Sequence, residues 1–96
     1  MMVLVTYDIN ITSAEGQRRL RNIAKKCENY GIRVQNSVFE CVVDAMQYAQ
    51  LKHDLIKLIN ADTDSIRFYR IGERYSARVE HFGAKQTIQV EDTLIL

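Results

Sequence analysis

The chain has 96 residues, of which 47% are hydrophobic and 26% are charged, and its formal net charge is +1. This length and balance predict one soluble globular domain over residues 1–96, with a single modest core. The first apolar run is too short for a membrane span or a signal peptide, and it ends at Asp8. Cys27 and Cys41 lack the spacing of a metal site and are expected to be buried reduced thiols, so we expect a cytoplasmic protein.

The first predicted strand covers residues 2–9. Val3, Leu4 and Val5 follow one another without a polar residue, which is typical of a central strand covered on both faces. Asp8 comes at the carboxyl end of this strand, since burial of a carboxylate in mid-strand is unfavourable without a partner. Strand ends of this kind often carry chemistry, so Asp8 is a candidate functional residue. The alternative is that Asp8 begins a turn or caps a helix.

A helix is expected over residues 13–29. The sequence at 12–15 is a predicted capping box, in which the Thr12 side chain accepts a hydrogen bond from an amide and Glu15 reaches back. Gly31 is expected to end the helix in the left-handed conformation. The buried stripe is predicted from the spacing i, i+3, i+4, i+7 of Leu20, Ile23, Ala24 and Cys27.

Six basic side chains lie between residues 18 and 33, where only Glu28 opposes them, while residues 40–64 contain more acidic than basic side chains. Such a distribution predicts a basic surface that suits a polyanion. The alternative is an ordinary solvated helix face. The basic residues are Arg18, Arg19, Arg21, Lys25, Lys26 and Arg33.

The middle of the chain is expected to contain extended structure and a second helix. Residues 32–43 are rich in strand-forming side chains, and the polar residues 35–37 predict a tight turn or sharp bend inside this stretch. Asp44 is a predicted helix cap with Gln47 at the capping-box position, and the helix is expected to reach about residue 60.

A strand over residues 65–71 is expected to end at Gly72, and residues 73–85 show no single pattern. Alternation of apolar and polar side chains at 87–91 predicts a further short strand. The order strand, helix, strand, strand, helix, strand is that of the ferredoxin-like α+β fold. Two helices would cover one face of the sheet and leave the other bare. We therefore expect a homodimer packed through the sheets, with residues 87–96 as a tail strand that pairs with the other subunit.

Few residues carry a strong chemical signal. The chain has no Gly-rich nucleotide-binding motif and no nucleophile elbow. His53 and His81 are not spaced as metal ligands. His53 is expected on a helix surface, and His81 in a loop where it could touch phosphate.

Asp8 becomes a candidate metal ligand if the two-fold axis of a homodimer passes near the end of the first strand. Asp8 would then meet Asp8 of the partner subunit, and two carboxylates held close favour a bound cation. Mg²⁺ is commonly held by one or two carboxylates together with substrate phosphate. A cation there would polarise a phosphoryl oxygen and activate a water.

Four stretches together resemble the small CRISPR-associated nuclease family called Cas-two. They are Tyr-Asp-Ile at 7–9, Arg-Val-Gln-Asn-Ser-Val-Phe-Glu-Cys at 33–41, Asp-Ser-Ile-Arg-Phe-Tyr at 64–69 and Arg-Val-Glu-His-Phe-Gly-Ala-Lys at 78–85. The resemblance covers nearly the whole chain, and the second stretch at its distance from the first is specific.

The resemblance implies a ferredoxin-like homodimer in which the paired Asp8 carboxylates bind a divalent metal, Mg²⁺ or Mn²⁺. It implies a metal-dependent endonuclease acting on duplex DNA, which we favour, or on single-stranded RNA, and a place in spacer acquisition between copies of the CRISPR integrase. The nucleic-acid-binding residues that it implies are Arg18, Arg19, Arg21, Arg33, Ser37 and Phe39.

Two alternatives to an enzyme are open at this point. The protein could be a non-catalytic dimeric scaffold that binds duplex DNA and bridges the CRISPR integrase, with no essential role for Asp8 in chemistry. A small-molecule regulatory domain shares the same topology, although no sequence feature marks an effector pocket.

Overall fold

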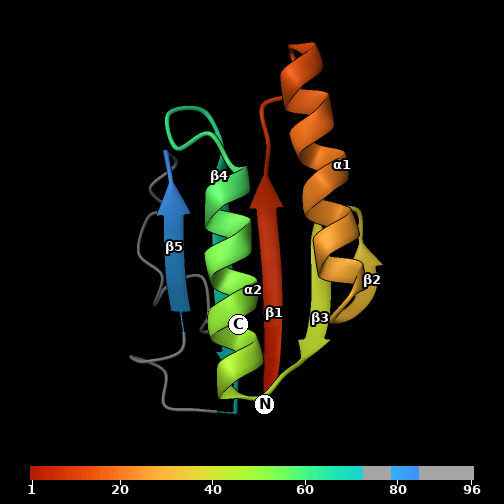
Figure 1. The fold of residues 1–96 in the computed structure, drawn as a ribbon, viewed down its shortest axis with the longest axis vertical. Helices are drawn as coiled ribbons and strands as arrows, with labels where there is room; N and C mark the ends of the chain where they lie inside the picture. Colours follow the sequence, from red (N-terminus) through yellow and green to blue (C-terminus); the bar gives the residue numbers. More distant parts are fainter. Residues whose placement is uncertain (73–78, 85–96) are drawn as a thin grey trace.

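The first strand, β1 (Met2–Asp8), is the middle strand of a five-stranded antiparallel sheet (Figure 1). The structure is a computed structural model and describes residues 1–72 and 79–84. The strand order is β2-β3-β1-β4-β5. The remaining elements are α1 (Ala14–Glu28), β2 (Gly31–Gln35), β3 (Val38–Val42), α2 (Ala45–Leu58), β4 (Ser65–Ile71) and β5 (Val79–Gly83). The first four strands have the ferredoxin-like order, which confirms the predicted α+β fold.

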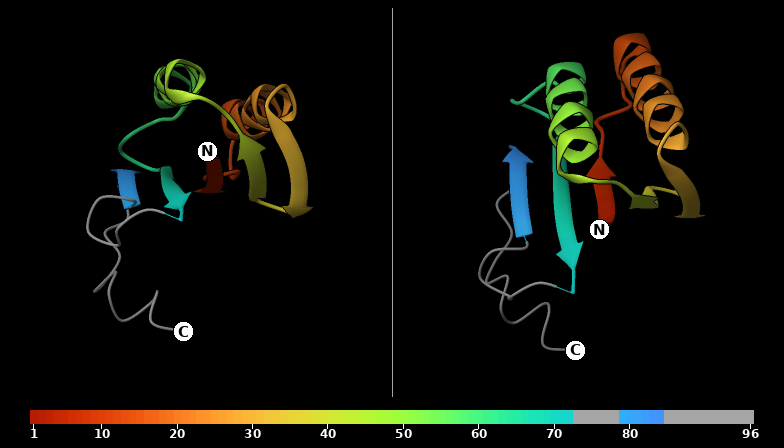
Figure 2. Two further views of the ribbon diagram at one scale, coloured as in Figure 1. Left: turned by 90° about the horizontal axis from the view of Figure 1, so that it is seen from below. Right: turned by 60° about the horizontal axis from the view of Figure 1, so that its bottom comes forward.

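Helices α1 and α2 lie side by side on the same face of the sheet (Figure 2). Neither helix of the described chain combines the length and the apolar content needed to cross a membrane. No described helix covers the opposite face, which we call the open face, so the described helices pack on one side of the sheet only, as the element order predicted.

The two helices begin at side-chain caps, one of which differs from the prediction. Asp44 and Gln47 form the predicted capping box at the start of α2. At α1 the predicted cap Thr12 is wrong by one residue: Ser13 accepts the hydrogen bond from the Gly16 amide at 3.0 Å. Thr12 instead bonds the Asn10 side chain, because the connection after β1 forms its own polar turn.

The prediction for Gly31 is also wrong in its mechanism. Helix α1 ends at Glu28, its C-cap Asn29 keeps ordinary helical backbone angles, and Gly31 opens β2 without a positive φ. The reason for glycine here is close approach, because a Cβ atom would lie 2.0 Å from the carbonyl oxygen of Glu40 on the neighbouring strand. Gly31 thus lets β2 pair tightly with β3.

Strand β5 lies where residues 73–85 showed no clear pattern in the sequence. It pairs antiparallel with β4, with His81 opposite Arg67. Gly83 ends the strand at a φ of 116°, which favours glycine. The predicted strand at 87–91 and the predicted tail at 87–96 lie outside the described residues.

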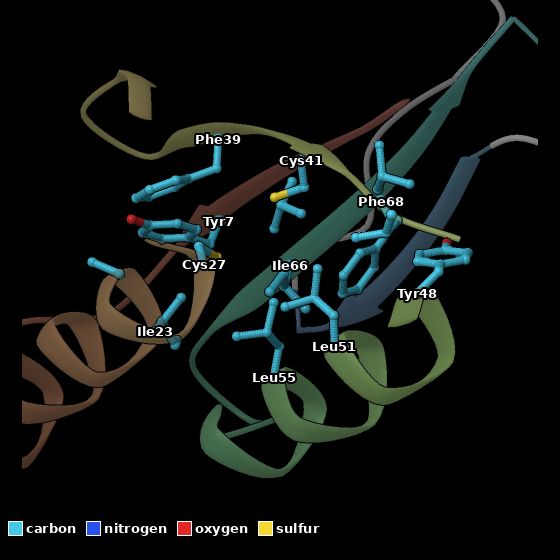
Figure 3. Packing of buried hydrophobic residues seen from close by; sticks show 14 of the residues in the cluster. Tyr7, Ile23, Cys27, Phe39, Cys41, Tyr48, Leu51, Leu55, Ile66 and Phe68 are labelled. Atoms are coloured by element: carbon cyan, nitrogen blue, oxygen red, sulfur yellow. The ribbon is translucent and has the colours of Figure 1, made fainter. Parts of the chain in front are cut away.

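The core lies between the helices and the sheet (Figure 3). Alternate residues of β1 point into it, and Val3 and Val5 have no exposed surface. Leu51 of α2 points toward Phe68 and Ile66 of β4, and Leu55 enters the same core from the next turn of the helix. Each fully buried side chain of this size contributes roughly 1.5–3 kcal/mol of transfer free energy.

Cys27 and Cys41 are both free and buried in this core, as predicted. Burial raises the pKa of the Cys27 thiol to about 12, with a further contribution from Cys41. Burial also raises the pKa of Cys41 to about 11. Both thiols are therefore protonated at neutral pH and are unsuited to metal binding or nucleophilic chemistry.

Candidate metal-ligating carboxylate and nucleic-acid interface

Asp8 is exposed at the carboxyl end of the central strand, opposite Ser65 of β4. The side chains of β1 alternate in burial, and Tyr7 enters the core while Thr6 and Asp8 belong to the face without described helices. The central position of the strand is confirmed, although Leu4 is only half-buried on this second face. Asp8 therefore stands on the open face, at the end of the strand.

A hollow of about 250 Å³ adjoins Asp8 on this open face. It contains side chains from three neighbouring strands, and two of them, Arg67 and Tyr69, were not singled out as functional by sequence reasoning. The signal that could have found them is the alternation of β4, which places both residues opposite the core-facing Ile66 and Phe68. The hollow is lined by Thr6, Tyr7, Asp8, Ser65, Arg67, Tyr69 and His81.

A larger cavity of about 690 Å³ lies on the other side of β1, between α1 and the turn that joins β2 to β3. The structure brings three of the predicted nucleic-acid-binding residues together at this cavity: Arg21, Arg33 and Ser37. Lys25 adds a third cation, and Glu28 provides one opposing charge. Three cations around one concave site attract phosphate groups.

Tyr7 lines the cavity, and it is also one of the residues that border the hollow on the other face of β1. Its hydroxyl is buried and has no hydrogen-bond partner within the described residues. Burial raises the pKa of this hydroxyl, and the nearby Cys27 adds to the rise. Tyr7 therefore keeps its proton at neutral pH and can act as a hydrogen-bond donor.

Phe39 has no exposed surface, so its ring presents no face on which a base could stack. It packs at 6.3 Å from the Tyr7 ring, and the Arg33 guanidinium lies 5.3 Å from its centroid. This cation–π contact helps to hold the exposed Arg33 at the cavity rim. In this structure Phe39 thus supports the site from the core, and a contact with nucleic acid stays an untested prediction.

The neighbouring arginines of α1 have different surroundings. Arg18 is exposed on the helix and lines none of the cavities described above. Arg19 donates from Nε to Asp64 at 2.8 Å, and its side chain is only 20% exposed. Asp64 has no exposed surface and also accepts from the amides of Asn10 and Asn60. Arg19 therefore has a partner within the fold, while its predicted role in binding nucleic acid is untested.

The electrostatics of Asp64 follow from these contacts. Burial alone would raise the pKa of its carboxyl, but the hydrogen bonds from Arg19 and from the two backbone amides outweigh burial and hold the pKa below its ordinary value. The carboxylate is therefore ionised at neutral pH and joins the start of α1 to the connection before β4.

The described residues of one chain do not form a complete metal site. No group of three or more His, Cys, Asp or Glu side chains comes together in residues 1–72 and 79–84. The exposed oxygen ligands of Asp8 are of the type that Mg²⁺ and Mn²⁺ prefer. Asp8 thus fits a divalent cation that draws its other ligands from phosphate, water or a second copy of the chain.

The fold and the site define the chain as a small ferredoxin-like α+β domain with an exposed carboxylate beside a small hollow and a basic cavity on the other side of the central strand. A family model for CRISPR associated protein Cas2 matches residues 1–79. The chain is 55% identical over 95 residues to the CRISPR-associated endonuclease Cas2 of Halalkalibacterium halodurans, with 99% of each chain covered. It is 53% identical over 96 residues to the CRISPR-associated endoribonuclease Cas2 of Chlorobaculum tepidum, with 100% of each chain covered.

Solved structures agree with these relatives. The crystal structure of Streptococcus pyogenes Cas2 at pH 6.5 is 54% identical, has a TM-score of 0.71, and covers 83% of this chain and 96% of its own. The chain therefore belongs to the Cas2 family of CRISPR-associated proteins, which confirms the resemblance seen in the sequence.

Proposed function

We propose that this protein is a divalent-metal-dependent endonuclease that hydrolyses phosphodiester bonds, with duplex DNA as the favoured substrate, during spacer acquisition in CRISPR defence. The observation that carries the proposal is the exposed Asp8 carboxylate at the end of the central strand, on the face that no described helix covers. Relatives more than 50% identical carry the names endonuclease and endoribonuclease, so duplex DNA and single-stranded RNA both enter the test.

The open face supports a homodimer. Cross-strand partners point to the same face of a sheet, so Val42 and Ile71, both opposite Met2, lie on the face of Asp8. Val42 is 70% exposed and Ile71 is 50% exposed. Exposed apolar side chains of this size favour burial against a second copy. Such a dimer would bring Asp8 towards Asp8 of the partner subunit.

In this proposal the paired Asp8 carboxylates hold Mg²⁺ or Mn²⁺, which when bound supplies polarisation of a phosphoryl oxygen and an activated water. The chain's own cations do the binding. Arg21, Lys25 and Arg33 attract the phosphate backbone at the basic cavity, with Arg33 held by its contact with Phe39. The proposed integrase contact would use the tail at 87–96.

The experiment compares wild type with Asp8→Asn on duplex DNA and on single-stranded RNA, with Mg²⁺ and with EDTA. The matched control is Asp62→Asn, which removes another exposed carboxylate, from the connection before β4. Gel filtration establishes the oligomeric state of all three proteins. The expected result is that wild type and Asp62→Asn cut one substrate only with Mg²⁺, while dimeric Asp8→Asn does not.

Unchanged cleavage by Asp8→Asn, or full cleavage in EDTA, would contradict the proposal. A dimeric wild type that binds DNA but cuts neither substrate would instead support the scaffold alternative. Arg21→Gln and Arg33→Gln are each expected to weaken nucleic-acid binding. Each should also make the negative slope of log affinity against log salt concentration less steep by roughly 0.7–0.9. Lys57→Gln, an exposed cation near the end of α2, is the charge-matched control.

A further inference from the structure

Arg67 and His81 are cross-strand partners on the open face of the sheet, next to Asp8 in the hollow. Arg67 is buried, with 8% of its surface exposed. Its Nε donates to Nδ1 of His81 at 3.2 Å, and its Nη1 donates to the hydroxyl of Tyr69 at 2.7 Å. The three side chains therefore form one connected hydrogen-bond network.

The direction of these hydrogen bonds assigns the remaining protons. An Nδ1 that accepts from Arg67 requires the neutral imidazole with its proton on Nε2. Burial and the Arg67 charge lower the pKa of His81 and favour this neutral form, while a backbone hydrogen bond to Gly83 opposes them. Because the Tyr69 oxygen accepts from Arg67, its own proton is available to donate elsewhere. Within the described ranges, three groups of the network are left without an assigned acceptor: Arg67 Nη2, His81 Nε2 and the Tyr69 hydroxyl.

Two of these donors are buried without an acceptor in the described part of the chain: Nη2 of Arg67 and Nε2 of His81. Leaving a buried donor unpaired is costly, and the cost is greater for a charged group. A cluster of donors that includes a guanidinium fits an anion with several acceptor oxygens.

The hollow restricts the size of that anion. Its volume of about 250 Å³ is below the roughly 300–1,000 Å³ of sites for drug-sized ligands, so it suits a single phosphate group better than a whole nucleotide. Thr6 and Ser65 also line the hollow, and each carries a hydroxyl that can donate a hydrogen bond. Asp8 lies at the same hollow, so a group bound there would lie beside this carboxylate.

We propose that Arg67, His81 and Tyr69 form an anion site that holds a phosphodiester group of the nucleic-acid strand beside Asp8. The identity of the anion as substrate phosphate rests on the proposed nuclease function. A divalent cation at Asp8 and the Arg67 guanidinium would repel one another, and a phosphate that contacts both compensates both charges. A carboxylate from a second copy of the chain could also accept these hydrogen bonds, so the test separates the two sources.

The direct test is a titration of the full-length wild type with dimethyl phosphate, in EDTA and at constant ionic strength, followed by NMR of the imidazole nitrogens. The chain contains two histidines, and the exposed His53 on α2 is an internal control. The expected result is a saturable shift of the His81 Nε2 resonance with no saturable shift at His53. In Arg67→Gln the apparent Kd should rise by about 10- to 100-fold, as expected for loss of a charged hydrogen-bond donor.

A second measurement uses cleavage. Arg67→Gln and His81→Gln are expected to raise KM or lower kcat/KM by at least about tenfold, while Arg67→Lys retains part of the activity because it keeps the charge. Lys57→Gln is the control for loss of a surface cation. Because the titration omits metal, a phosphate shift at His81 without any cleavage would support the anion site while rejecting the proposed nuclease.

Two results would overturn the inference. The first is a wild type whose His81 resonance does not respond to dimethyl phosphate, or responds no more than His53. The second is that the Arg67→Gln and Arg67→Lys variants both lose the dimer, while the His81 resonance of the wild type does not respond to phosphate. That result would assign the acceptor to a second copy of the chain.

Discussion

The buried ion pair between Arg19 and Asp64 gives a sharp prediction about stability. Asp64→Asn replaces a carboxylate whose two oxygens accept from Arg19, from the amides of Asn10 and Asn60, and from the Thr63 hydroxyl. Either orientation of the new amide places its NH₂ group against donors. Removing one partner from a buried pair costs about 3–5 kcal/mol, so we expect Asp64→Asn to lower the free energy of unfolding by that amount.

The variants Arg19→Gln and Arg18→Gln compare the loss of a charge that is paired inside the fold with the loss of a charge on the surface. Arg19→Gln leaves the Asp64 carboxylate with its backbone donors, so we expect a smaller loss of about 1.5–3 kcal/mol. Arg18→Gln makes the same chemical change one residue earlier at an exposed position, and its effect should stay within about 0.5 kcal/mol. Urea unfolding at one fixed protein concentration measures all three variants, because a dimer's stability depends on concentration.

The pH dependence checks the same reasoning. The folded pKa of Asp64 is lowered, so its contribution is present above the ordinary value of 3.8 and is lost as pH falls through the folded pKa. The stability difference between wild type and Asp64→Asn should therefore shrink in strong acid. A loss below about 1 kcal/mol for Asp64→Asn at pH 7, or equal losses for Arg18→Gln and Arg19→Gln, would refute the argument.

Three further outcomes are expected. Tyr48→Phe removes the hydroxyl that donates a hydrogen bond to Glu80. Burial would raise the pKa of Glu80, but this bond and Lys52 outweigh it and hold the pKa low. The variant should therefore lose about 1 kcal/mol of unfolding free energy at pH 7 in urea, and this loss should fade as pH falls below the ordinary pKa of 4.5. Leu51→Ala leaves a cavity in the core and should cost about 2–5 kcal/mol in the same assay. Cys27 and Cys41 should react with a thiol reagent at pH 8 only in denaturant, and fast reaction of the native protein would contradict their burial.

Local patterns in the sequence determined most of the architecture. The run of apolar residues before Asp8 identified the central strand, and the Asp44–Gln47 capping box identified the start of α2, because both signals depend on residues close together in the chain. The order of elements then predicted the ferredoxin-like fold and its open face. Short-range spacing was less accurate at α1, where Ser13 rather than Thr12 is the cap.

The candidate site was predicted in part. Asp8 was recognised from its place at a strand end, and it is exposed there. The basic residues were recognised as a group, but their roles could not be separated by sequence. Arg21 and Arg33 meet at one cavity, while Arg19 turns towards Asp64, which lies 45 residues further along the chain.

The sequence by itself thus determined the fold class, the central strand and the presence of a carboxylate with many cations near it. Only the tertiary structure decided which side chains face one another, because that depends on strand register and on contacts between distant segments. The pairing of β4 with β5 places His81 opposite Arg67, and no local pattern encodes this pairing. The hydrogen-bond donors beside Asp8 therefore follow from the sheet, and they are absent from any single stretch of sequence.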